Sequence, residues 1–307
     1  DGGDWDWFTN TIPIATIDTS KNEFKFPTPP EDYPEKYRTK YNIGSGARYF
    51  LQGNLAFMDV EGEYHYNKTT GILYYYPKGE DGAIEDQTVV VPTMQKAIYF
   101  KGAEKENLAD EPDPNQQVHN ITLDGLAVKD TEFADYFTYS WNFGDAGAGI
   151  GYFPKAAEGS TNPSFCETTD REELRVGSIT LTGTNHITIT NTRVKNSGLY
   201  GIIYAGDNQY NTLKNSVIED TGYGGLIFDG GYPAVGKYNN HNTVENVLIH
   251  EVGDLVGHAV GMTVMSSGQN TFTNMEIFDT PKRALLVIGG YRRDRKGGDK
   301  NYDEIKD

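Results

Sequence analysis

Carboxylate and histidine side chains gather in two neighbouring stretches of the sequence. The first stretch ends an apolar run with Asp229, and the second contains Glu251, Asp254 and His258. Two carboxyl groups at a fixed separation can carry out acid–base or nucleophilic catalysis, because one donates a proton while the other acts as a base or nucleophile. We predict that Asp229 pairs with Glu251 or Asp254 in this way.

Further residues could hold a ligand beside this pair. His258 and Arg283 could position hydroxyl groups or shift the pKa of a carboxyl group, and Asp207 could line the end of the same groove. Tyr232 and Trp141 could add aromatic contacts to the ligand. We expect no cofactor and no catalytic metal, although loop carboxylates can bind a structural calcium ion.

The acidic candidates also have a purely structural interpretation. Glu251 aligns with Asn196 and Asp220 when the sequence is compared with itself, so it could be a turn residue that bonds local amides. Asp254 could have the same role, and His258 could be a hydrogen-bonded residue at the start of a strand. The sequence leaves both interpretations open.

The spacing of these residues follows from an internal repeat. Asparagine opens four similar segments at intervals of 24, 31 and 28 residues, and glycine or proline closes each segment seven positions later. Self-similarity at this period indicates stacked supersecondary units. We predict that the asparagines form a hydrogen-bonded ladder at a bend of each unit, where their side chains tolerate a left-handed backbone. They are Asn191, Asn215, Asn246 and Asn274.

Short β-branched and aromatic runs flank each repeated asparagine, with glycine, asparagine and aspartate between them. Such runs are typical of strands. The segments between them are too short for the helices that connect parallel strands in α/β folds. We therefore predict an all-β fold, a right-handed parallel β-helix of the pectate-lyase type, with three short strands in each coil.

A β-helix would place side chains of neighbouring coils in rows. Like positions on adjacent strands lie about 4.8 Å apart, so carboxyl groups one or two coils apart would have the separations that glycoside hydrolysis uses. In the strand that ends at Asp229, alternation points Leu226 and Phe228 inward and the carboxylate outward. The equivalent positions in other coils hold Ala205 and Ile288, so neither is acidic.

The composition limits the classes of partner. The chain has 307 residues, a formal net charge of −17 and a pI near 4.7, which argues against nucleic acids and anionic membranes, because phosphate contacts need a basic surface. A single cysteine, Cys166, excludes an internal disulfide and a cysteine-based zinc site. We predict no membrane span, since no run approaches the roughly 18 apolar residues of a spanning helix.

The chain divides into regions of different character. Residues 1–48 form an irregular N-terminal segment, 49–118 a β-hairpin and the first coils, 119–290 the β-helix with an aromatic-rich loop insertion at 130–175, and 291–307 a tail or loop. Neither end has the pattern of a complete cap over the coils, so we expect the natural chain to extend beyond both ends.

The second region contains a hairpin pattern. Glu63–Tyr66 and Ile72–Pro77 read as strands joined by a short turn that ends at Gly71. We also predict a coil strand at Thr88–Pro92 and a solvated acidic loop at Glu104–Gln117.

The hairpin and the repeats carry a resemblance to known proteins. The pattern Gly-Asn…Asp-x-x-Gly-Glu-Tyr-x-Tyr-Asn…Gly-x-Leu-Tyr-Tyr-x-Pro lies between Gly53 and Pro77, and Asn-Ile-Thr-Leu-Asp-Gly-Leu begins at Asn120. With the repeated asparagines, this resembles secreted bacterial carbohydrate-active β-helix proteins, in particular glycoside hydrolase families 120, 141 and 110. The resemblance covers roughly Arg48 to Gly290.

The resemblance implies a plant or algal poly- or oligosaccharide substrate and hydrolysis of its glycosidic bonds by two carboxylates in a groove on the β-helix. It also implies a bacterial protein that is secreted, periplasmic or on the cell surface. Two alternatives stay open. A polysaccharide lyase would use Lys195, Lys214 or Arg283 beside a uronate, and a non-catalytic β-helix would serve as an adhesin or carbohydrate-binding protein.

Overall fold

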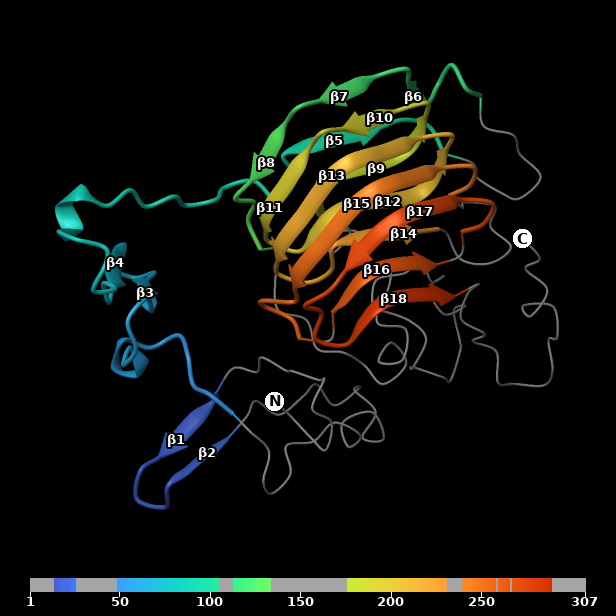
Figure 1. Ribbon diagram of the computed structural model, residues 1–307. Helices are drawn as coiled ribbons and strands as arrows, with labels where there is room; N and C mark the ends of the chain where they lie inside the picture. Colours follow the sequence, from blue (N-terminus) through green and yellow to red (C-terminus); the bar gives the residue numbers. More distant parts are fainter. Residues whose placement is uncertain are drawn as a thin grey trace, which may run out of the picture.

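Stacked coils of β-strands form the body of the protein (Figure 1). The computed structural model describes residues 14–25, 49–104, 113–133, 176–230, 239–257, 259–265 and 267–288. In this part of the chain, strands of successive coils pair in parallel and build two seven-stranded sheets. The predicted parallel β-helix is therefore confirmed.

The first sheet, sheet I, has the strand order β18-β16-β14-β12-β9-β5, and β6 also pairs with β9. Its strands are β5 (Ile98–Lys101), β6 (Val118–His119), β9 (Gly177–Asn185), β12 (Tyr200–Gln209), β14 (Leu226–Asp229), β16 (Val260–Met265) and β18 (Arg283–Ile288).

The second sheet, sheet II, has the order β17-β15-β13-β10-β7, and β11 pairs with both β13 and β8. Its strands are β7 (Thr122–Asp124), β8 (Ala127–Lys129), β10 (Thr188–Thr190), β11 (Arg193–Ser197), β13 (Thr212–Thr221), β15 (Thr243–Val252) and β17 (Thr271–Ile277). The two short strands β10 and β11 flank the first repeated asparagine, as predicted, whereas later coils join the equivalent segments into one long strand.

Each coil of sheet II bends at a left-handed asparagine. The four repeated asparagines have φ angles between 49° and 53°. The side-chain amide of Asn246 donates to Oδ1 of Asn215, and that of Asn274 donates to Oδ1 of Asn246, both at 2.9 Å. The predicted ladder is confirmed for Asn215, Asn246 and Asn274. Asn191 has the same left-handed bend, but its side-chain amide donates to Asp124 at 2.7 Å.

A second, buried ladder at the bend that leads into sheet II was missed by the sequence analysis. Nδ2 of Asn211 donates to Oδ1 of Asn242 at 3.0 Å, and Nδ2 of Asn242 donates to Oδ1 of Asn270 at 2.9 Å. Oδ1 of Asn211 also accepts the backbone N–H of Ile187 at 2.8 Å. These bonds satisfy polar groups that burial would otherwise leave unpaired.

Apolar side chains of the two sheets meet inside the coils. The ring of Phe228 in sheet I stacks on Tyr204 with a centroid distance of 4.3 Å and meets Phe272 of sheet II edge-on at 5.4 Å. Each fully buried large apolar side chain stabilises the fold by about 1.5–3 kcal/mol. The buried set also includes Ile179, Leu181, Ile187, Ile189, Ile202, Leu213, Ile218, Leu226, Val244 and Ile249.

Two antiparallel hairpins lie apart from the coils in Figure 1. One pairs β1 (Thr16–Asp18) with β2 (Glu23–Lys25). The other pairs β3 (Tyr64–Asn67) with β4 (Ile72–Tyr75) and confirms the predicted hairpin. Short 3₁₀ helices at Leu55–Phe57 and Ile84–Asp86 flank the second hairpin.

The coil strand predicted at Thr88–Pro92 is wrong. This segment contains no strand, and its three valines are between 60% and 70% exposed. Consecutive valines favour an extended backbone, but a strand also requires a neighbour to pair with. In the described part of the chain, the first strand of sheet I is instead β5.

Candidate functional site

The structure divides the predicted site residues between the two ends of sheet I. Glu251, Asp254 and Arg283 lie at the turns from which strands of this sheet begin. Asp207 and Asp229 lie near the opposite end, where β12 and β14 finish. Three further candidates fall outside the described residues: Trp141, Tyr232 and His258.

The predicted pairing of Asp229 with Glu251 or Asp254 is wrong. The backbone N–H of Asp254 donates to the carbonyl of Thr221 at 3.1 Å, which places Asp254 beside the turn that precedes β14. Gly225 belongs to that turn, and Asp229 follows it by four residues. In an extended strand, four residues span roughly 13 Å, so Asp229 lies far from the turn. The alternation of residues in a strand predicts the face to which a side chain points. It does not predict at which end of the strand a residue from another coil lies.

Asp229 ends β14 on the outer face of sheet I. Its neighbour Phe228 points into the core, so alternation turns Asp229 to the other face, as predicted. Ala205 and Met265 lie beside it on the flanking strands, and Ile288 follows in the last coil, so Asp229 is the acidic residue of this row. Although it faces outward, its side chain is fully buried, with 0% exposed.

A β-bulge in β12 lies beside the end of β14. The pairing of β12 with β9 shifts register between Ala205 and Asn208, so Gly206 and Asp207 form the irregular segment, and Gly206 has a φ of 75°. Asp207 is 0% exposed, and its Oδ1 accepts a hydrogen bond from Nε2 of Gln209 at 3.1 Å. Bulges of this kind re-aim side chains and are common next to functional sites.

Glu104 brings a third carboxyl group to the bulge. Its Oε1 is buried and lies so close to Gly206 that a Cβ there would be 1.9 Å away from it. The prediction that this residue lies in a solvated loop is therefore wrong. The sequence offered one indication of this position. Glu104 follows β5 by three residues, and β5 pairs with β9 at the edge of the same sheet. We call Glu104, Asp207 and Asp229 the carboxylate cluster.

The burial of these acidic side chains does not follow from the apolar packing of the coils. Removing an ionised carboxyl group from water costs free energy that packing of apolar residues would not. Buried titratable groups gathered at one point are instead characteristic of functional sites. The cluster is thus the strongest candidate site among the described residues.

Glu251 has the backbone of a turn residue. Its φ is 52°, and the equivalent residues Asn196, Asp220 and Asp279 have φ angles between 48° and 52°. Its Oε2 lies 2.9 Å from Nδ1 of His250. These observations favour the structural interpretation that the sequence left open for Glu251.

The surroundings of Asp254 disfavour its charged form. The side chain is exposed, but partial burial, together with the negative charges of Asp220 and Glu251, raises the pKa of Asp254 above its ordinary value. Three acidic groups therefore lie close together at this turn. Arg283 begins β18 one coil further on, where Pro281 packs beside Gly253.

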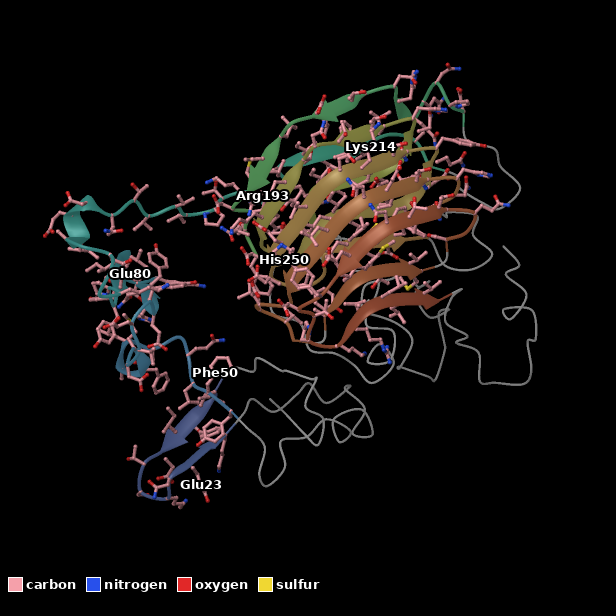
Figure 2. All side chains as sticks on the ribbon, viewed as in Figure 1. Glu23, Phe50, Glu80, Arg193, Lys214 and His250 are labelled. Atoms are coloured by element: carbon pink, nitrogen blue, oxygen red, sulfur yellow. The ribbon has the colours of Figure 1, made fainter. Side chains whose placement is uncertain are left out.

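An ionic network occupies the outer face of sheet II, where Figure 2 labels Arg193 and His250. At its centre is Glu219, whose side chain is only 5% exposed. Its carboxylate accepts Nε of Arg193 at 2.8 Å and lies 3.3 Å from Nζ of Lys195 and 3.2 Å from Nε2 of His250. Lys195 also contacts Asp220 at 2.8 Å. The network ties together three successive coils.

Replacing Glu219 with glutamine is expected to weaken the fold in a pH-dependent way. Burial alone raises the pKa of Glu219, but hydrogen bonds from Arg193 and Lys195 outweigh it and hold the pKa below its ordinary value. This carboxylate therefore stabilises the protein above the ordinary pKa, and the contribution is lost as the pH falls through the lower folded-state value. Urea unfolding should show a loss of about 1–3 kcal/mol at neutral pH and a smaller loss in acid.

The exposed Glu245 on β15 provides a matched control. Glu245→Gln should leave the free energy of unfolding unchanged at both pH values. The same loss for Glu219→Gln in acid as at neutral pH would contradict the assigned role of its charge.

Among the described residues, no group of three or more histidine, cysteine, aspartate or glutamate side chains is arranged to hold a metal ion. The expectation of no cofactor, with a structural calcium ion possible, stays a prediction. No helix in the described segments is long and apolar enough to cross a membrane.

Comparison with known proteins agrees with the fold. Residues 177–292 match the family model described as a right handed beta helix region. A solved structure described as a glycoside hydrolase superposes with a TM-score of 0.61 at 18% sequence identity, over 92% of this chain and 49% of that one, so the chain spans about half the length of that protein. No curated protein gives a significant match. The coils described above are those of a right-handed parallel β-helix.

Proposed function

We propose that this protein is a glycoside hydrolase and that the carboxylate cluster is its catalytic centre. The observation that carries the proposal is the burial of Asp207 and Asp229, with Glu104, around one β-bulge on the outer face of sheet I. The similarity of fold to a glycoside hydrolase supports the same class of reaction.

Hydrolysis of a glycosidic bond needs two carboxyl groups with different roles. One protonates the leaving oxygen, and the other attacks the anomeric carbon or activates a water molecule. We assign Asp229 and Asp207 to this pair and Glu104 to positioning them, because Glu104 contacts the bulge itself.

The proposal includes an opening step. Both aspartates are fully buried in this structure, so a sugar reaches them only when the groups that cover them move aside. Exclusion of water around the carboxyl groups would then strengthen their electrostatic effect on the reacting bond. As the resemblance implies, we propose a plant or algal poly- or oligosaccharide as the substrate and a site of action outside the bacterial cytoplasm.

Digestion of a panel of plant and algal polysaccharides in ¹⁸O-labelled water tests the proposal. We expect at least one substrate to yield fragments that each carry one labelled oxygen at the new reducing end, detected by mass spectrometry. NMR of the first products identifies whether the configuration at the anomeric carbon is inverted or retained. An unlabelled, ultraviolet-absorbing unsaturated product would instead identify a lyase, and binding without any product would identify a non-catalytic β-helix.

A further inference from the structure

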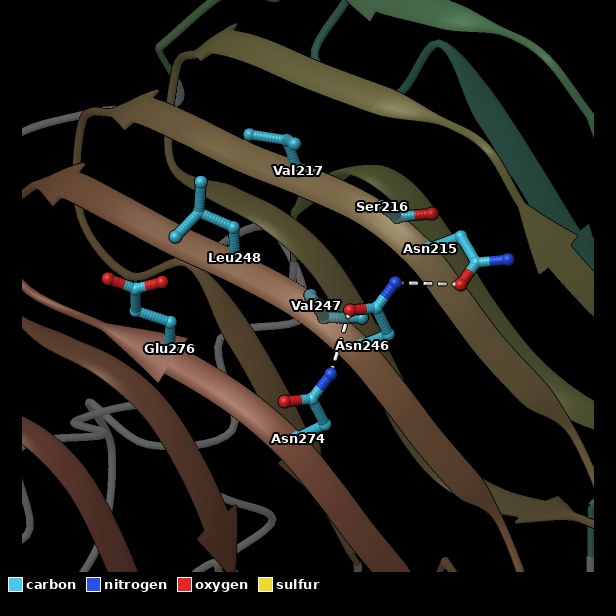
Figure 3. Close-up of a pocket in the computed structure, with 8 residues that line it drawn as sticks. All are labelled: Asn215, Ser216, Val217, Asn246, Val247, Leu248, Asn274 and Glu276. Carbon is cyan, nitrogen blue, oxygen red and sulfur yellow. Dashed lines mark hydrogen bonds between the residues drawn. The ribbon is translucent and has the colours of Figure 1, made fainter.

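A groove runs across the coils of sheet II, on the other sheet from the carboxylate cluster (Figure 3). Asn215, Asn246 and Asn274 of the ladder form one side of it, and Val217 and Leu248 lie along its length. Its volume is about 330 Å³, at the lower end of the range for ligand sites. The groove can therefore hold a short segment of a longer ligand.

The ladder gives the groove a repeating set of hydrogen-bonding groups. An asparagine amide has two N–H donors and an oxygen with two lone pairs. Asn246 uses one donor toward Asn215 and one lone pair for Asn274, as the dashed lines in Figure 3 show. One donor and one lone pair of this exposed residue stay available to a ligand. Equivalent groups recur at the coil spacing of about 4.8 Å.

The floor of the groove is apolar. Val217 and Leu248 are direct neighbours across β13 and β15, and each is half-buried on the outer face of sheet II. Glu276 follows Leu248 in the same row on β17 and is exposed. A ligand that fits this surface has apolar patches on one side, hydroxyl groups at its edge, and a repeat close to one coil.

A chain of pyranose sugars has these properties, since each ring presents C–H groups on its face and hydroxyl groups around its rim. The charge of the groove selects among such chains. Among the described residues that line it, Glu276 is the charged one. The whole protein also carries a net charge of −17, so polyanionic glycans are repelled. We propose that the groove along the asparagine ladder binds a neutral glycan chain that lies parallel to the axis of the β-helix.

Isothermal titration calorimetry with two neutral linear probes, xylohexaose and cellohexaose, tests the groove. The protein for all titrations carries Asp229→Asn, so that turnover does not consume the probe. We expect at least one probe to bind and Leu248→Ser to weaken its affinity at least fivefold, because the substitution removes the apolar contact with the sugar face. Val217→Ser, in the same row, should have a similar effect.

Thr271→Ala, at an exposed position of β17 away from the groove, is the matched control and should leave the affinity unchanged. Thermal unfolding of each variant shows that the fold is retained. Absence of binding, unchanged affinity in both serine variants, or tighter binding of a galacturonate hexamer would overturn the proposal. Hydrolysis is measured separately, so failure of the groove and failure of the catalytic assignment give different results.

Discussion

Replacing Asp229 with asparagine is expected to reduce kcat for glycoside hydrolysis by roughly 10²- to 10⁴-fold, the usual contribution of a positioned acid or base. The substitution keeps the size of the side chain and removes its charge. Asp229 is 0% exposed, so the free energy of unfolding of the variant is measured alongside kcat to separate an effect on the chemistry from an effect on the fold. Loss of activity without loss of stability distinguishes a catalytic carboxylate from a structural one.

The matched control for this prediction is Asp279→Asn. Asp279 is exposed and has a φ of 48°, a conformation that Asn274 adopts in the same coil. This variant should keep both the activity and the stability of the natural protein. Full activity in Asp229→Asn, measured on the substrate found in the polysaccharide panel, would remove the carboxylate cluster from consideration as the catalytic centre.

The fold could be predicted because its signals are local and repeat. Each coil carries its own asparagine bend and its own short strands, so the period and the outer ladder follow from the sequence alone. The inner ladder offered the same kind of signal, since Asn211, Asn242 and Asn270 recur at 31 and 28 residues, the intervals of the outer ladder.

The site was harder to predict because its residues come from different coils. Alternation predicted the face of the sheet to which Asp229 points. The identity of the second carboxyl group, however, depends on which end of the strand each turn approaches. Glu104 shows the same limit, because only the packing of its segment against the bulge at Gly206 brings it to the cluster. The ionic network around Glu219 depends likewise on register between coils, which irregular coil lengths conceal in the sequence.

Register between coils also explains a column of glycines at the start of sheet I. Gly201, Gly225 and Gly261 occupy equivalent positions in successive coils, and Ala284 follows them in the last coil. A Cβ added at Gly225 would lie 2.4 Å from Cγ2 of Ile249 and 2.7 Å from the carbonyl oxygen of Gly261. The column therefore sets how closely sheet I approaches the side chains of sheet II.

Gly225→Ala is accordingly expected to lower the free energy of unfolding by about 3 kcal/mol, the upper part of the usual range for overpacking. The cost is high because one of the two clashing groups is backbone and cannot rotate away, so the coils on either side must separate. Urea unfolding followed by circular dichroism measures the change. Gly79→Ala is the control, because no atom lies within 4 Å of its added Cβ. Equal stability of the two variants would mean that the coils are packed more loosely than this column requires.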